Sequence, residues 1–117
     1  MASKKPKRKS VRKKPLKHYN GLTPGEAERL ALLAEECAET IQVIGKILRH
    51  GYESCHPDDP NRTTNRGLLE KELGDVVFAK DLLVSKGDVK DSIIHEAYTE
   101  KAQRVVQYLH HQKRNDE

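Results

Sequence analysis

Apolar residues recur at a helical period through most of the chain after residue 23. Thr23 suits an N-cap, Pro24 suits the first helical position, and Glu26 completes a capping-box pattern. The periodicity continues to His50, and Gly51 stands where a glycine commonly follows a helix end. At about 100° per residue, one side of this predicted helix carries an apolar stripe that suffices for ordinary packing. The stripe consists of Leu30, Leu33, Cys37, Ile41, Ile44 and Leu48.

Residues 51–66 are rich in turn formers and are predicted to form a loop. A second helix is expected from about residue 67 to 86, where Gly87 ends it. Asp88 can cap a third helix that reaches about His111. No segment alternates convincingly in the manner of a strand. The pattern therefore predicts an all-α fold, a bundle of three helices.

The composition limits the chain to one small domain. Of 117 residues, 35% are apolar, there is no Trp and only one Phe, so a core of this size is marginal without oligomerisation. No apolar run approaches the roughly 20 residues that span a bilayer, and the first twenty residues lack the apolar stretch of a signal peptide. Two cysteines are too few for a disulfide scaffold. We therefore expect a cytoplasmic protein without membrane contact.

Charge is segregated along the chain. Residues 1–17 contain nine Lys or Arg and no acid, which leaves 13 basic against 18 acidic residues in 18–117, a net charge of −5. The sequence thus predicts a basic disordered tail, 1–17, and an acidic helical domain, 18–117. The tail is interpreted as a solubilising extension, a contact with nucleic acid or another polyanion, or a localisation signal.

Acidic residues occupy positions where apolar residues are expected. On the first helix, Glu36 and Glu39 share one side with Leu32, Val43 and Ile47, and Glu35 lies at its edge. On the second helix, Glu72 and Asp75 fall within an apolar stripe. That stripe consists of Leu68, Val76, Ala79 and Leu83.

Each helix thus offers two carboxylates at i, i+3 spacing, about one turn apart on one face. If these faces pack together, four carboxylates converge in a groove where unpaired charge costs several kcal/mol. Divalent cations resolve that repulsion, and hard oxygen donors favour Mg²⁺ or Mn²⁺. The alternative is a solvated face on which Lys46 and Lys71 pair with the acids.

The two acidic motifs resemble those of a known superfamily. Residues 35–39, EECAE, match EExxE, and residues 72–75, ELGD within KELGDVVF, match ExxD. Together they are similar to the motifs of the MazG-type all-α nucleoside triphosphate pyrophosphohydrolases, which also include dimeric dUTPases and phosphoribosyl-ATP pyrophosphohydrolases. The resemblance covers about residues 24–112. The segment RHGYES…TNRGLLEKELGD also resembles small stand-alone members, many of them from bacteriophages.

The resemblance implies an α-helical bundle that assembles as a homodimer or homotetramer, and Mg²⁺-dependent cleavage of a nucleoside triphosphate to monophosphate and pyrophosphate. It places Glu36, Glu39, Glu72 and Asp75 as ligands of two or more ions, with Mn²⁺ as a substitute, and Glu35 as a residue that orients water. It favours dGTP or GTP as substrate, with phosphoribosyl-ATP as a possibility. One departure is the 32 residues between Glu39 and Glu72, more than is usual in the family.

Fixed cations for the phosphates are the next candidates. Lys101 and Arg104 lie one turn apart on the third helix, and similar sequences use such a pair to hold the triphosphate. Lys46 lies two turns beyond Glu39 on the same side. Asn65 and Arg66 precede the second helix and could reach a base or phosphate, although a capping role for Asn65 is equally open.

Besides the pyrophosphohydrolase, two functional hypotheses remain open, and two chemical interpretations are disfavoured. Cys37 reads as a core residue, so covalent catalysis is disfavoured, and a zinc site at Cys55 and His56 with His50 lacks recognisable spacing. A nucleic-acid-associated module acting through the basic tail is the rival function. The third is an inactive scaffold that retains only the fold.

Overall fold

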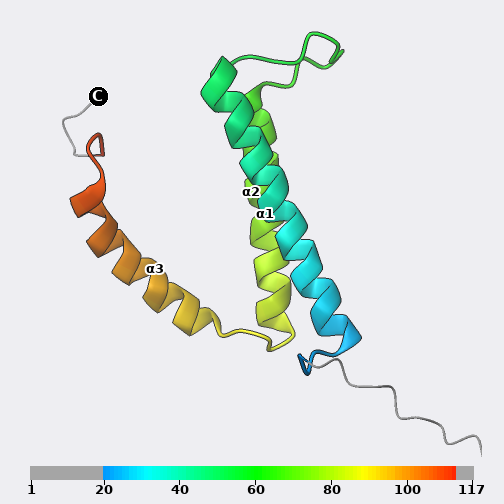
Figure 1. The fold of residues 1–117 in the computed structure, drawn as a ribbon, viewed down its shortest axis with the longest axis vertical. Helices are drawn as coiled ribbons and strands as arrows, with labels where there is room; N and C mark the ends of the chain where they lie inside the picture. The colour runs from blue at the N-terminus through cyan, green and yellow to red at the C-terminus, as the bar shows by residue number, and fades with distance from the viewer. Residues whose placement is uncertain (1–19, 113–117) are drawn as a thin grey trace, which may run out of the picture.

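The computed structural model describes residues 20–112. Three α-helices follow one another, α1 (Pro24–His50), α2 (Asn65–Ser85) and α3 (Asp91–Val105), and a short 3-10 helix, η1 (Val106–Tyr108), ends the series (Figure 1). The described residues form no strand beyond an isolated bridge between Cys55 and Thr64. An all-α fold is therefore confirmed. The predictions about the basic tail, 1–17, lie outside the described residues.

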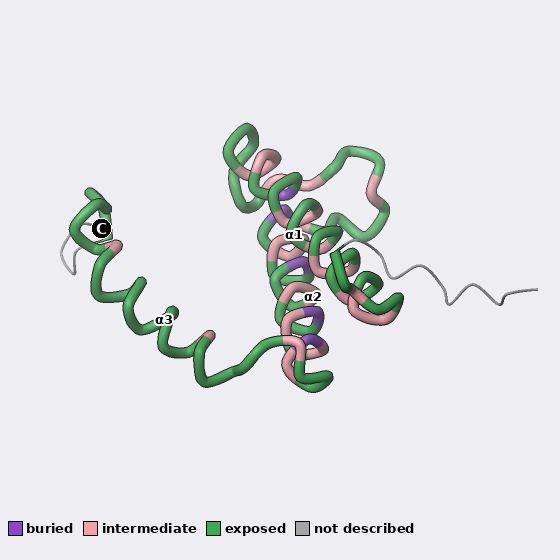
Figure 2. Tube along the Cα trace, turned by 60° about the horizontal axis from the view of Figure 1, so that its bottom comes forward, coloured by how far each residue is buried: buried purple, intermediate pink, exposed green. Residues whose placement is uncertain are grey.

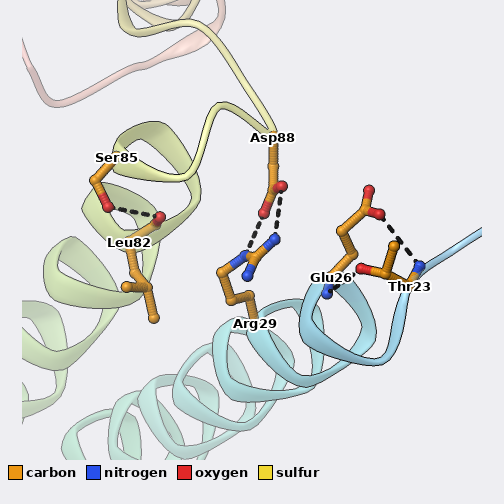
Figure 3. A network of polar contacts seen from close by, with 6 residues as sticks. All are labelled: Thr23, Glu26, Arg29, Leu82, Ser85 and Asp88. Atoms are coloured by element: carbon orange, nitrogen blue, oxygen red, sulfur yellow. Dashed lines mark hydrogen bonds and ion pairs between the residues drawn. The ribbon is translucent and has the colours of Figure 1, made fainter.

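The ends of α1 follow from local chemistry. The Thr23 hydroxyl accepts a hydrogen bond from the Glu26 amide, and the Glu26 carboxylate accepts one from the Thr23 amide, both at 3.1 Å (Figure 3). At the other end, Gly51 has φ of 86°, and its amide donates to the Ile47 carbonyl at 2.7 Å. Glycine adopts this positive φ without the steric cost of a side chain. The predicted bounds of α1 are thus confirmed.

Helix α2 begins two residues before the predicted start. The Thr64 side chain is the N-cap and accepts a hydrogen bond from the Gly67 amide at 3.1 Å. Of the two roles left open for Asn65, capping is therefore not the one it has. Asn65 is instead the first residue of α2 and is buried. Its position brings it against the end of α1, where the 51–64 loop departs.

Helices α1 and α2 form an antiparallel hairpin (Figure 1). Its buried apolar residues are few, namely Val43, Ala79 and Leu83. The side of α1 that faces α2 is the one that carries Glu36 and Glu39. The apolar stripe expected to serve packing is largely exposed in the single chain, with Ile41 69% and Leu48 82% accessible. Cys37 is also exposed, so its assignment to the core is wrong.

Helix α3 projects away from the hairpin (Figures 1 and 2). None of its residues is buried, and only Ile94 and Val105 are half-buried. It ends at Val105 and continues as η1 to Tyr108, short of the predicted His111. The described chain is therefore a helical hairpin with a separate third helix, and the predicted three-helix bundle is not formed within it.

Asp88 does not cap α3. The N-cap position belongs to Lys90, which makes no side-chain capping bond. The Asp88 carboxylate instead binds Arg29 of α1 in a bidentate pair, with distances of 2.6 Å from Nε and 2.9 Å from an Nη atom (Figure 3). This pair fastens the α2–α3 connection to the first turns of α1.

No helix in the described range combines the length and apolar character that crossing a membrane requires.

Candidate metal centre

Three carboxylates meet between α1 and α2. Glu36, Glu39 and Glu72 each offer one carboxylate oxygen, and these three atoms lie within 4.8 Å of one another. Glu72 is only 9% exposed, whereas Glu36 and Glu39 are half-buried. The i, i+3 spacing of Glu36 and Glu39 puts both on the side of α1 that faces α2. We call these three residues the carboxylate cluster.

Two oxygens of the carboxylate cluster lack partners. Oε2 of Glu36 and Oε2 of Glu72 are shielded from solvent, and neither accepts a hydrogen bond from any residue in the described range. A buried acceptor without a partner is costly, and more so when it carries charge. The nearest cation is Lys71, whose Nζ lies 3.5 Å from Oε1 of Glu72. This contact leaves both Oε2 atoms unsatisfied.

The surroundings of Glu36 disfavour its ionised form. Loss of contact with water is the largest cause that raises the pKa of Glu36 above its ordinary value. Neighbouring negative charges raise this pKa further, in the order Glu39, Asp75, Glu72 and Glu35. The carboxylate cluster therefore concentrates negative charge that Lys71, the one cation paired with it among the described residues, neutralises only in part.

Asp75 departs from the prediction that four acids converge. Its Oδ2 accepts a hydrogen bond from Lys71 Nζ at 2.8 Å, an i, i+4 ion pair on α2, and it is not part of the carboxylate cluster. Asp75 is nevertheless close enough to raise the pKa of Glu36. Asp75 therefore follows the alternative interpretation, in which a lysine pairs with the acid. Glu35 is exposed and also lies outside the cluster.

The predicted substrate-binding residues separate into two groups. Lys46 and Asn65 line one pocket, of about 350 Å³, where α1, the loop and α2 meet. Lys101 and Arg104 are exposed on α3, the helix that projects away from the hairpin (Figure 2). In the single chain, the structure therefore does not bring these two cations beside the carboxylate cluster.

The pocket contains residues that the sequence interpretation did not assign to binding. Arg49 and His50 come from the last turn of α1, and His56 and Asp59 come from the loop. Arg49 and His50 follow Lys46 by three and four residues, a helical spacing from which they could have been predicted as binding residues. Residues His50, Cys55 and His56 do not bring ligand atoms close enough for a metal, so the described structure does not support the zinc interpretation.

The donor chemistry of the carboxylate cluster fits a hard divalent cation. All three residues offer oxygen ligands, which suit Mg²⁺ or Mn²⁺, and the two unpartnered oxygens are acceptors that a cation would satisfy. Three carboxylates can therefore hold an ion. Asp75, whose Oδ2 pairs with Lys71, lies outside this group.

Comparison with protein families, curated proteins and solved structures finds no match to the chain.

Proposed function

We propose that this chain is a Mg²⁺-dependent nucleoside triphosphate pyrophosphohydrolase that converts a (d)NTP and water to the monophosphate and pyrophosphate. Mn²⁺ is expected to substitute for Mg²⁺, and dGTP and GTP are the first substrates to try. The observation that carries the proposal is the pair of shielded, unpartnered carboxylate oxygens on Glu36 and Glu72. The similarity of EECAE and ELGD to the MazG-type motifs supplies the reaction.

The proposed roles follow from the arrangement of the acids. Glu36, Glu39 and Glu72 would hold the cation, with Asp75 as a further ligand if Lys71 moves away. Bound divalent ions neutralise phosphate charge and lower the pKa of water. Glu35, exposed at the edge of the cluster, is the candidate to orient the water. Glu36 must be ionised to bind the cation. Because its pKa is raised, protons compete with the cation for this carboxylate.

Water is the proposed nucleophile. Cys37 belongs to the other stripe of α1 and is exposed, so it is unsuited to attack a ligand held at the carboxylate cluster. In the net reaction, the water oxygen bonds to the α-phosphorus, and the bond from that phosphorus to the oxygen bridging to the β-phosphate breaks. Pyrophosphate leaves with that bridging oxygen, and the two protons of the water pass to the product phosphates or to solvent.

Assembly into a homodimer or homotetramer is part of the proposal. Apolar side chains remain exposed on α1, and others are exposed on α2 at Leu73, Val77 and Phe78. Helix α3 buries no residue. A second copy would cover such surfaces and could bring Lys101 and Arg104 near a carboxylate cluster.

Turnover of a panel of nucleoside triphosphates, with and without Mg²⁺, tests the activity, with products identified by mass. Glu72→Gln and Glu39→Gln should abolish metal-dependent release of pyrophosphate. Glu70→Gln is the matched control, because Glu70 is exposed on α2 and lies outside the cluster. Full activity in both cluster variants, or products other than monophosphate and pyrophosphate, would contradict the proposal. Preference for a pyrimidine would overturn the dGTP or GTP assignment alone.

A further inference from the structure

The pocket at the loop end of the hairpin is a second candidate site. It measures about 350 Å³, within the range of about 300–1,000 Å³ that is usual for small-molecule sites. Its walls come from the last turn of α1, the 51–64 loop and the first turn of α2. The loop accounts for much of the long separation between the two acidic motifs. That extra length therefore forms part of a binding-sized cavity.

The loop wall is fastened at several points. The Asn65 and Arg66 amides donate to the carbonyls of Ser54 and Tyr52, at 2.8 and 2.9 Å. Arg66 also pairs with Glu53 at 2.7 Å and lies over the Tyr52 ring, 4.4 Å from its centroid. Arg66 is thus occupied in holding the loop. These contacts fix the pocket wall relative to both helices.

The charged groups of the pocket are mostly cationic. Lys46 and Arg49 form no ion pair with another described residue, and His50 and His56 add two imidazoles. The single acid, Asp59, accepts hydrogen bonds from the Asn61 and Thr63 amides, both at 2.9 Å. Those bonds direct its charge into the loop. Two unpaired cations in one cavity therefore favour an anionic ligand.

A buried amide adds a polar group to the same cavity. Asn65 is only 5% exposed and lines the pocket. Its Nδ2 donates to the Gly51 carbonyl at 3.0 Å, and its Oδ1 accepts no hydrogen bond from the described residues. Phosphate hydroxyls and bound water donate hydrogen bonds. Oδ1 of Asn65 can therefore accept a hydrogen bond from a hydrated anion in the pocket.

The pocket also adjoins the carboxylate cluster. Leu68, in its wall, precedes Glu72 by four residues, about 6 Å along α2 at 1.5 Å per residue. Lys46 follows Glu39 by seven residues, about 10 Å along α1. One extended ligand can therefore contact both places.

We infer that this pocket binds the polyphosphate end of a ligand, with Lys46 and Arg49 as the residues that pair with its phosphate oxygens. The identification of that ligand as the nucleoside triphosphate substrate rests on the proposed function. The affinity for polyphosphate itself does not, because it requires no metal and no turnover.

Binding of inorganic tripolyphosphate to the full chain, with EDTA and about 0.15 M salt, tests the inference. Amide NMR signals of Ser54, Thr63 and Asn65 are the readout, because the basic N-terminal segment also attracts polyanions. The double variant Lys46→Gln with Arg49→Gln should weaken binding at these signals by about tenfold or more. Lys86→Gln with Arg62→Gln removes the same charge outside the pocket and should change the affinity by less than about twofold.

Three results would overturn the inference. They are tripolyphosphate shifts confined to the N-terminal segment, equal losses in the two double variants, and shifts of the pocket signals by guanosine instead of tripolyphosphate. The Glu72→Gln variant should still bind tripolyphosphate. Mn²⁺ binding to the wild-type cluster is measured separately. Loss of metal binding and loss of tripolyphosphate binding are therefore distinguishable.

Discussion

Glu36 on α1 and Glu72 on α2 each keep one carboxylate oxygen shielded from solvent and without a hydrogen-bond partner in the described chain. Both oxygens belong to a group of three acids whose ligand atoms lie within 4.8 Å of one another. An ordinary helix interface would place apolar groups at such positions. The metal-free interface is therefore less stable than an apolar one would be, and the proposed binding of a cation would offset that loss.

The first prediction concerns metal-free stability and its response to Mn²⁺. Glu72→Gln should raise the Tm in EDTA by a few degrees, because it removes one negative charge from a crowded, shielded place. Mn²⁺ should raise the Tm of the wild type and have little effect on the variant. Thermal unfolding followed by circular dichroism measures both quantities. Glu70→Gln should resemble the wild type in both, and an equal Mn²⁺ response in Glu72→Gln would contradict the metal centre.

The second prediction concerns pH. Because the pKa of Glu36 is raised in the folded chain, that chain binds more protons than the unfolded chain between the ordinary and the raised pKa. In EDTA, the contribution of Glu36 to the free energy of unfolding should therefore fall as pH rises through this window, and stay at its lower value above it. Urea unfolding at a series of pH values measures the slope. Glu36→Gln should remove this contribution, and an unchanged slope in that variant would count against the assignment.

Local signals explain why some of the fold could be predicted from sequence. The ends of α1 depend on Thr23, Glu26 and Gly51, and each of these residues bonds to a partner only a few positions away in the sequence. The carboxylate cluster was also predictable in part, because Glu36, Glu39 and Glu72 interrupt apolar stripes at helical spacing. The i, i+4 pairing of Asp75 with Lys71 was equally local. The spacing alone did not decide which acid pairs with Lys71 and which acids join the cluster.

Other features depend on contacts between distant residues. Asp88 satisfies the sequence pattern of a cap, and only the approach of Arg29, 59 positions away, gives it a different partner. Helix α1 has two stripes with apolar residues, and periodicity alone does not decide which of them faces α2. Predicting the pocket required the path of the loop. That path depends on hydrogen bonds that Asp59 accepts from the Asn61 amide and that Asn65 donates to the Gly51 carbonyl.

The third prediction concerns the pair between Arg29 and Asp88. Both side chains are less than one-fifth exposed, and the bidentate geometry lowers the pKa of Asp88. Asp88→Asn should lower the Tm by several degrees at neutral pH. In the wild type, this stabilisation should be lost as pH falls through the lowered pKa of Asp88, because the unfolded chain then binds the proton first.

A double-mutant cycle separates the pair from its single residues. Arg29→Gln together with Asp88→Asn should cost clearly less than the sum of the two single variants, since each single change already breaks the pair. Asp81→Asn is the control, because Asp81 is exposed and pairs with the adjacent Lys80. Additive losses across the cycle would show that the two residues stabilise the chain independently.

The fourth prediction concerns assembly through the exposed stripe of α1. Ile41 and Leu48 are 69% and 82% exposed in the single chain, so replacing both with Gln should change the stability of a monomer by less than about 0.5 kcal/mol per site. If a second copy covers the stripe, the same double variant loses buried apolar surface and should dissociate. Light scattering after size exclusion, over a range of concentrations, measures the mass. Ala38→Gln, on a different exposed face of α1, should keep the wild-type mass. A wild-type chain that is already monomeric, or a double variant that stays associated, would show that this stripe does not hold copies together.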